Sequence, residues 1–320
     1  MITNVTIKRA VVCLLCIGIL SLSVCLLVRP KKEFSENENR YLTKFPSFTA
    51  KALLDGAYTE ALGDWLADHF PQRDFFVGFK SGAEITCGRK EINHIYVAED
   101  DYLIESYAKP QNTERITDTL VSFYDKVDTS KVDVNLMLVP TAVTVYSDKL
   151  PAHAPLSDQT GTAAAIYEAS GIPAIDCTDR LLDGASQGQL YYRTDHHWTT
   201  LGAYFGYLAY CDAKNMTPVS LDTLTAQTVT DAFAGTLYSK VNDYSRPKDS
   251  ITIYTNPGDD LTVTYPDTGE VTDSLYNLDY VTEKDKYSLF LNNIHPLVEI
   301  ENSAASSQDA LMLIKDSATV

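Results

Sequence analysis

Three short, mostly apolar runs constrain the fold of this chain more than any other feature of its sequence. They are "VDVNLMLVP" at residues 132–140, "GIPAIDC" at 171–177 and "DALMLIKDS" at 309–317. Runs of this length bounded by turn signals are typical of strands buried on both faces, as in a parallel sheet. Helical patterns lie between them, near residues 161–170 and 200–211. The alternation predicts an α/β fold with a parallel sheet and flanking helices.

A second region has the pattern of antiparallel strands. Between about residues 229 and 287 the composition shifts to Thr, Tyr, Asp and Gly. Apolar and polar residues alternate there and are interrupted at Asn256–Gly258 and Pro266–Gly269, as in hairpins. We predict a β-rich insertion in the α/β domain, together with a hairpin that turns at Glu99–Asp101 and a helix near residues 112–127.

The N-terminus carries an uncharged run, Ala10–Val28, between basic residues at positions 8 and 9 and at positions 29, 31 and 32. As a helix this run spans about 28 Å, close to the hydrocarbon thickness of a bilayer. A cleaved signal peptide is the alternative, but its apolar region is typically shorter, and no small-x-small cleavage site precedes Arg29. We predict that residues 1–32 form a cytoplasmic stub and a single transmembrane anchor. Residues 33–320 are then the extracytoplasmic domain, because the long remainder is the translocated part.

Charge and cysteine content exclude several classes of function. The net charge of −17, with 43 acidic against 26 basic residues, opposes binding to nucleic acid, whose phosphates are bound by Lys and Arg. Outside the apolar N-terminal run the chain keeps Cys87, Cys177 and Cys211, with no CxxC or Cys/His spacing of a zinc site. We therefore predict no disulfide framework, no metal and no other cofactor.

The stretch "DHHW", residues 195–198, precedes a helical pattern for which Thr199 or Thr200 is the expected cap. Asp195 and His197 are two residues apart, so an extended backbone places both side chains on one side. An aspartate that accepts the Nδ1 proton of a histidine fixes its tautomer, and Nε2 can then take a proton from a nucleophile. The pair is a candidate for the orienting acid and the base of a catalytic triad.

Ser317 is the candidate nucleophile, because it directly follows an apolar strand pattern, and chemistry in open α/β sheets gathers at the carboxyl ends of strands. Two other interpretations of residues 195–197 stay open. One is a structural helix entry in which Asp195 caps the helix and the His and Trp rings pack. The other is a metal site, which needs three or four ligands, and no further His, Cys or Glu group stands out as a partner.

The longer stretch "TDHHWTTLGAY" resembles the signature of the bacterial DHHW protein family. Similarity extends through "FSENENR", "DHFPQRDFF", "IYVAEDDYLIES", "LMLVP", "FAGTLYSK" and "LMLIKDS". That family is similar to the SGNH-hydrolase-like domains of alginate O-acetyltransferases. The resemblance implies a flavodoxin-like parallel sheet, with Asp195 as orienting acid, His197 as base and Ser317 as nucleophile. His196 occupies the variable middle position and receives no role. Members continue past the Lys-Asp-Ser stretch, so we expect a chain truncated near residue 320.

The resemblance implies ester chemistry. We expect a membrane-anchored, extracytoplasmic ester hydrolase or O-acetyltransferase that acts on cell-envelope glycan. The alternative is a catalytically silent protein that uses the same scaffold to bind glycan or a protein partner. The expected partners are the membrane, through the N-terminal helix, and a cell-surface polysaccharide.

Overall fold

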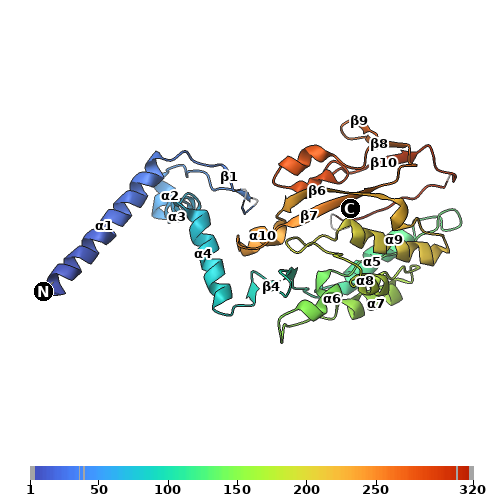
Figure 1. Ribbon diagram of the computed structural model, residues 1–320, viewed down its shortest axis with the longest axis horizontal. Helices are drawn as coiled ribbons and strands as arrows, with labels where there is room; N and C mark the ends of the chain where they lie inside the picture. Colours follow the sequence, from blue (N-terminus) through green and yellow to red (C-terminus); the bar gives the residue numbers. More distant parts are fainter. Residues whose placement is uncertain (1–3, 36, 39, 308, 317–320) are drawn as a thin grey trace. The chain divides into compact units, whose positions relative to one another are not determined.

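The structure is a computed structural model that describes residues 4–35, 37–38, 40–307 and 309–316. The chain forms two compact units (Figure 1). The first runs to Thr86 and includes Asn242–Tyr244, and the second comprises Cys87–Val241 and the residues from Ser245 onward. The predicted division between residues 32 and 33 concerns the membrane and stays a prediction.

The first unit begins with helix α1 (Asn4–Val28). Its candidate membrane span Ile7–Val28 has 22 residues, and the most apolar 18 consecutive residues have a mean hydropathy of 3.0 and are not buried. At 1.5 Å per residue it extends about 33 Å, enough to cross a bilayer. The helix therefore fits the predicted single-pass anchor.

Short elements follow α1. Strands β1 and β2 pair antiparallel, with Phe34 opposite Tyr41. Thr49 caps the next helix through its side chain, and Gly56, with φ of 87°, separates it from the following one. The elements after α1 are β1 (Phe34–Ser35), β2 (Arg40–Tyr41), α2 (Ala50–Leu54), α3 (Ala57–Asp68) and α4 (Arg73–Thr86).

The second unit opens with an antiparallel sheet in the order β3-β4-β5. Its strands are β3 (Glu91–Ile92), β4 (Ile95–Val97) and β5 (Leu103–Glu105). Asp100 and Asp101, with φ of 54° and 64°, form the turn between β4 and β5. The hairpin predicted at residues 99–101 is confirmed.

The three longest helices of the second unit, α5, α7 and α9, begin at capping side chains. Asn112 accepts a hydrogen bond from Arg115 N, Asp158 from Gly161 N, and Thr199 from Gly202 N. The helices predicted near residues 112–127, 161–170 and 200–211 are confirmed. The α-helices are α5 (Thr113–Tyr124), α6 (Ala142–Val145), α7 (Gln159–Ser170), α8 (Thr178–Gly184), α9 (Thr200–Lys214) and α10 (Thr236–Val241). The 3₁₀ helices are η1 (Ser147–Lys149), η2 (Leu221–Thr223), η3 (Leu278–Thr282) and η4 (Lys286–Leu289).

The predicted parallel sheet is not confirmed. Among the described residues, parallel pairing is limited to one bridge between Leu136 and Ala174, held by Leu136 N to Pro173 O and Ile175 N to Leu136 O. The third apolar run forms no strand in its described part, residues 309–316, and Leu311–Ile314 are exposed. An apolar run becomes a strand only when a neighbouring edge accepts its backbone hydrogen bonds, and here only two of the three runs meet.

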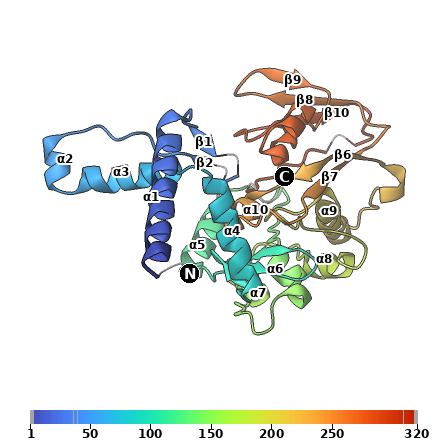
Figure 2. The same ribbon diagram turned by 60° about the vertical axis from the view of Figure 1, so that its left-hand side comes forward.

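The region rich in Thr and Tyr forms antiparallel strands, as its alternation predicts. Strands β6 (Thr225–Phe233) and β7 (Asp249–Thr255) make one pair, and β8 (Leu261–Tyr265), β9 (Glu270–Thr272) and β10 (Glu299–Asn302) form a sheet in the order β10-β8-β9 (Figure 2). The turn at residues 266–269 joins β8 to β9, and Gly269 has φ of 74° there. The turn predicted at residues 256–258 instead connects β7 to β8, and so joins the β6-β7 pair to the three-stranded sheet.

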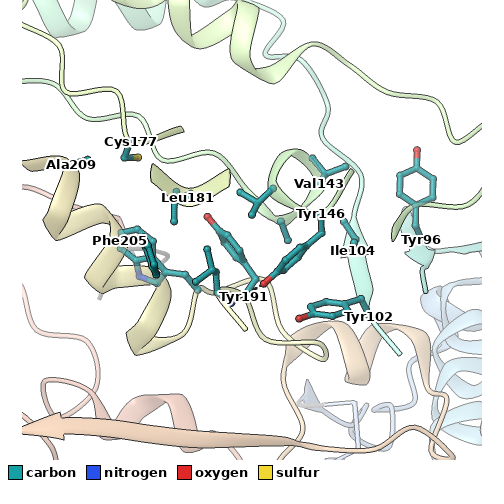
Figure 3. Close-up of a cluster of buried hydrophobic side chains, with 14 of the residues drawn as sticks. Tyr96, Tyr102, Ile104, Val143, Tyr146, Cys177, Leu181, Tyr191, Phe205 and Ala209 are labelled. Carbon is teal, nitrogen blue, oxygen red and sulfur yellow. Dashed lines mark hydrogen bonds between the residues drawn. The ribbon is translucent and has the colours of Figure 1, made fainter. Parts of the chain in front are cut away.

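Two clusters of buried side chains form the core of the second unit. The first joins β4, β5, α6, α8 and α9, and in Figure 3 Tyr146 lies between Tyr102 and Tyr191. The second is built from Tyr192, Phe233, Ile251, Ile253, Tyr287, Leu289 and Phe290. Tyr191 and Tyr192 are consecutive but enter different clusters, as side chains on an extended segment do. The segment that leads to Asp195 is therefore held between the two clusters.

Leu181 in α8 tests the first cluster, because it has no exposed surface, whereas its neighbour Leu182 is 43% exposed. We expect Leu181→Ala to lower the free energy of unfolding by about 2–5 kcal/mol through loss of packing. Leu182→Ala should change it by less than about 0.5 kcal/mol. Urea unfolding of the full chain in detergent, followed by circular dichroism, measures both. Equal effects of the two substitutions would contradict the described core.

Candidate active site

The candidate site lies on the loop before α9. Tyr191 pairs with Trp198 in an antiparallel bridge, and Tyr192 N donates to His197 O at 3.2 Å. These contacts close residues 192–197 into a tight loop. Trp198 packs against α9, where a side chain at Gly206 would press on its ring.

A buried carboxylate from another part of the chain fixes the base of this loop. Asp249, at the start of β7, is 2% exposed. It accepts hydrogen bonds from Arg193 N (3.0 Å), Thr194 N (2.8 Å), Thr194 Oγ1 (2.6 Å) and Gln189 Nε2 (2.8 Å). Backbone donors in the loop are thus satisfied without regular secondary structure.

Asp195 is also buried, with 2% of its surface exposed. Its Oδ1 accepts from His197 N at 3.0 Å and from Nδ1 of the same histidine, and its Oδ2 accepts from Thr236 N at 2.6 Å. A Cβ at Gly235 would overlap this carboxylate, so the glycine permits the close approach. Burial by itself raises the pKa of Asp195, but its hydrogen bond and charge interaction with His197 outweigh burial and lower the pKa to about 2. The carboxylate stays ionised at neutral pH.

The imidazole of His197 is oriented by this contact and by two neighbouring rings. Nδ1–H donates to Asp195, which leaves Nε2 as the acceptor nitrogen, and no described residue hydrogen-bonds to Nε2. The Tyr287 ring stacks on the imidazole with centroids 3.9 Å apart and planes at 14°. The His196 ring lies 4.0 Å away at 33°. The ring is therefore fixed in both tautomer and plane.

The two rings that contact His197, those of His196 and Tyr287, carry no charge near pH 7. Burial lowers the pKa of His196, so its imidazole is neutral there. Burial, and then the carboxylates of Asp195 and Asp316, raise the pKa of Tyr287. The phenol keeps its proton, and its oxygen is buried without a hydrogen-bond partner among the described residues. A positive charge on His197 would face the electron-rich ring of Tyr287.

Two of the three predicted triad residues therefore lie together. Asp195 and His197 contact one another as the spacing predicts, and Thr199 is the cap of the helix that follows. Ser317 lies outside the described residues. The catalytic roles of all three stay predictions.

The metal interpretation uses the same side chains. Ligand atoms of Asp195, His196 and His197 lie within 4.8 Å of one another, so the group could hold a metal ion. Asp195 Oδ1 and His197 Nδ1 are, however, already joined by a hydrogen bond. A metal bound to that nitrogen would have to displace this proton.

An open cavity of about 500 Å³ lies beside the loop. Its lining combines the rings of Tyr102 and Tyr146 with two cations, Lys149 and Arg193. Lys149 stands 5.5 Å from the Tyr102 ring centroid, and Arg193 stands 5.4 Å from it. Arg193 donates its backbone N–H to Asp249, so the cavity and the candidate site share one anchoring carboxylate.

Sequence reasoning missed three residues of this arrangement. Thr236 lies in "FAGTLYSK", which the family resemblance pointed to without giving it a role. Asp249 and Tyr287 are far from residues 195–198 in the chain, and no local pattern marks them. Asp249 does begin an alternating strand, a position where an acidic residue is uncommon.

Residues 96–244 match the family model described as the SGNH hydrolase-like domain of acetyltransferase AlgX. The matched range includes Asp195 and His197 and ends before Ser317. The predicted resemblance to SGNH-hydrolase-like domains is confirmed. No curated protein matches the chain.

Solved structures show a similar fold. A DHHW family protein from Eubacterium siraeum has a TM-score of 0.56 and 24% identity over 67% of this chain and 72% of that chain. Bacillus cereus PatB1, determined with a sulfonyl adduct, has a TM-score of 0.50 and 16% identity over 66% and 75%. A weaker match, which does not establish a shared fold, is the O-acetyltransferase domain of Pseudomonas putida AlgJ, with a TM-score of 0.41 and 19% identity over 50% of this chain and 64% of that chain.

The depressed pKa of Asp195 predicts how stability depends on pH. The value falls from 3.8 to about 2 on folding, so its contribution is complete above about pH 4 and is lost as pH falls toward 2. Between pH 5 and pH 2 the wild type should lose about 2 kcal/mol more unfolding free energy than Asp195→Asn. Urea unfolding at each pH measures the difference.

Asp222→Asn, at an exposed position, is the control and should follow the wild type. If wild type and Asp195→Asn lose stability in parallel as pH falls, the carboxylate does not hold the described contacts.

Proposed function

We propose that this chain is an ester hydrolase or O-acetyltransferase that uses Asp195, His197 and Ser317 as a catalytic triad on cell-envelope glycan. The observation that carries the proposal is the buried contact between Asp195 and His197 Nδ1. It leaves Nε2 able to accept a proton from a hydroxyl. The match of residues 96–244 to an SGNH hydrolase-like acetyltransferase domain supports ester chemistry.

The reaction has two halves. Ser317 Oγ attacks the carbonyl carbon of the acyl donor, its proton passes to His197 Nε2, and that proton then goes to the leaving oxygen as the ester bond breaks. Water or a sugar hydroxyl next gives its proton to Nε2 and attacks the acyl carbon, and Ser317 recovers its proton. Asp195 stabilises the imidazolium in both halves and stays ionised, in keeping with its low pKa.

Electrostatics near the end of the described chain supports the choice of serine. The carboxylate of Asp316, one residue before Ser317, is close enough to Tyr287 to raise the pKa of its phenol. Tyr287 in turn stacks on His197.

The glycan and its location belong to the same proposal. The cavity beside the loop is lined by Lys149, Arg193, Asp100 and Asp101, whose hydrogen-bond donors and acceptors suit the hydroxyl groups of a sugar. Helix α1 anchors the chain in the cell membrane, and residues 33–320 lie outside the cytoplasm, where cell-envelope glycan is found. A catalytically silent scaffold that binds glycan would use the same cavity without the serine.

Labelling the full chain with a serine-directed fluorophosphonate tests the triad. We expect one label, on Ser317, which is absent in Ser317→Ala and is retained in Ser306→Ala, a change at an exposed serine of the same segment. His197→Gln should slow labelling by about 10²- to 10⁴-fold, the usual contribution of a general base. The readout is the mass of the labelled peptide against time.

Labelling that persists in Ser317→Ala would exclude this serine as the nucleophile. An unlabelled wild type that still retains oligosaccharide would favour the silent scaffold. Inhibition of labelling by a chelator, with recovery on adding zinc, would favour the metal interpretation.

A further inference from the structure

The juxtamembrane hairpin, residues 45–70, exposes the apolar side chains that a soluble unit of this size would bury. It comprises the segment before α2, α2 itself and α3, with Phe70 at its end. Neither helix contains a buried residue. Phe45, Phe48 and Leu54 are 62%, 64% and 89% exposed. Among the described residues of the first unit, Pro71 is buried, but no aromatic or branched aliphatic side chain is.

The hairpin is nevertheless ordered by aromatic contacts. The Phe45 ring meets the Trp65 ring edge-on at 5.0 Å, and the Phe48 ring meets Tyr58 at 5.3 Å. These contacts pin the incoming segment along one face of α3. By helical periodicity Glu60 and Asp64 lie on the side of α3 away from Tyr58 and Trp65, and both are exposed. Asp68 instead binds Arg40. The hairpin thus has an aromatic side and an acidic side.

Two contacts attach the hairpin to the residues just after α1, and a cavity lies between the hairpin and the end of the helix. Lys31 Nζ lies 5.4 Å from the Trp65 ring centroid, and His69 Nε2 hydrogen-bonds to Lys32 O at 3.3 Å. A cavity of about 600 Å³ is lined both by the end of α1, including Cys25 and Arg29, and by the end of the hairpin, including Phe70. Figure 2 shows α2 and α3 projecting from the side of α1.

These contacts determine how deep the hairpin lies in a bilayer that α1 crosses. Cys25 lies three residues before Val28, the last residue of α1, which is about 4.5 Å along the helix axis. If α1 crosses a bilayer, this level is where hydrocarbon gives way to lipid headgroups. Side chains attached there lie in the same layer. Aromatic rings concentrate at this depth in membrane proteins, and Lys and Arg side chains reach from it toward lipid phosphates.

We propose that the juxtamembrane hairpin lies in the interface of the bilayer that α1 crosses. Phe45, Phe48 and Leu54 contact lipid acyl chains, and Arg29 and Lys32 lie at the level of the phosphates. The acidic side, with Glu60, faces water, away from anionic headgroups. The inference rests on the proposed anchor and does not depend on the ester chemistry.

The bilayer suits this surface better than a protein partner does. The exposed side chains adjoin a helix that carries no charged residue from Ala10 to Val28, so lipid can cover both surfaces continuously. Arg29, Lys31 and Lys32 occur at the level where phosphates are expected, and Glu60 and Asp64 occur on the opposite side of α3. Insertion by about 5–10 Å is usual for helices that lie in the membrane plane.

Photocrosslinking of the full chain in nanodiscs of phosphatidylcholine tests the proposal. The photoreactive residue p-benzoylphenylalanine replaces Phe48 in one variant and Glu60 in a matched variant on the other side of the hairpin. After irradiation we expect the Phe48 variant to gain the mass of one phospholipid and the Glu60 variant to gain none. A third variant, at Leu20 in α1, should give a lipid adduct whenever α1 is in the bilayer.

A lipid adduct at Leu20 without one at Phe48 would overturn the proposal and leave the anchor intact. A crosslink from Phe48 to a second copy, or to another part of the same chain, would overturn it and identify the surface that covers the hairpin instead. Lack of an adduct at both Leu20 and Phe48 would refute the anchor and the hairpin proposal together. None of these results depends on labelling of Ser317.

Discussion

The burial of one carboxylate, Asp195, is the constraint on which the candidate site depends. An ionised group at 2% exposure is tolerated only if hydrogen bonds replace its lost water. Here the donors are the backbone N–H groups of His197 and Thr236 and the imidazole Nδ1–H of His197. The charge therefore organises two separate segments, the loop before α9 and the start of α10. The same contacts that make the carboxylate stable in the interior also orient the imidazole.

The surrounding structure makes this arrangement rigid. Asp249 fixes the backbone just before Asp195, so the loop is held by two buried carboxylates that contact different donors. Tyr191 and Tyr192 insert into separate core clusters on either side. Tyr287 comes from the second cluster and stacks on His197. Packing, hydrogen bonding and ring stacking thus converge on one imidazole, and this preorganisation is the property that general base catalysis requires.

Local patterns in the sequence predicted the parts of the structure that depend on local physics. The spacing of Asp195 and His197, the cap at Thr199 and the turn at residues 99–101 all follow from backbone geometry over a few residues. The parallel sheet was not predictable in the same way, because strand pairing depends on distant partners. Leu136 meets Ala174, but residues 309–316 find no edge among the described residues. Tyr287, Asp249 and Thr236 join the site through tertiary contacts for which the sequence carries no local signal.

The orientation of the His197 imidazole is the central claim, and nitrogen-15 NMR of the histidine-labelled chain measures it directly. The chain has six histidines, and the His197 signals are those lost in His197→Gln. At a pH where the ring is neutral, the structure predicts a proton on Nδ1 and a bare Nε2. In Asp195→Asn we expect a mixture of the tautomer protonated on Nδ1 and the tautomer protonated on Nε2. A proton on Nε2 in the wild type, or a tautomer unchanged by Asp195→Asn, would contradict the claim that Asp195 orients His197 for proton transfer.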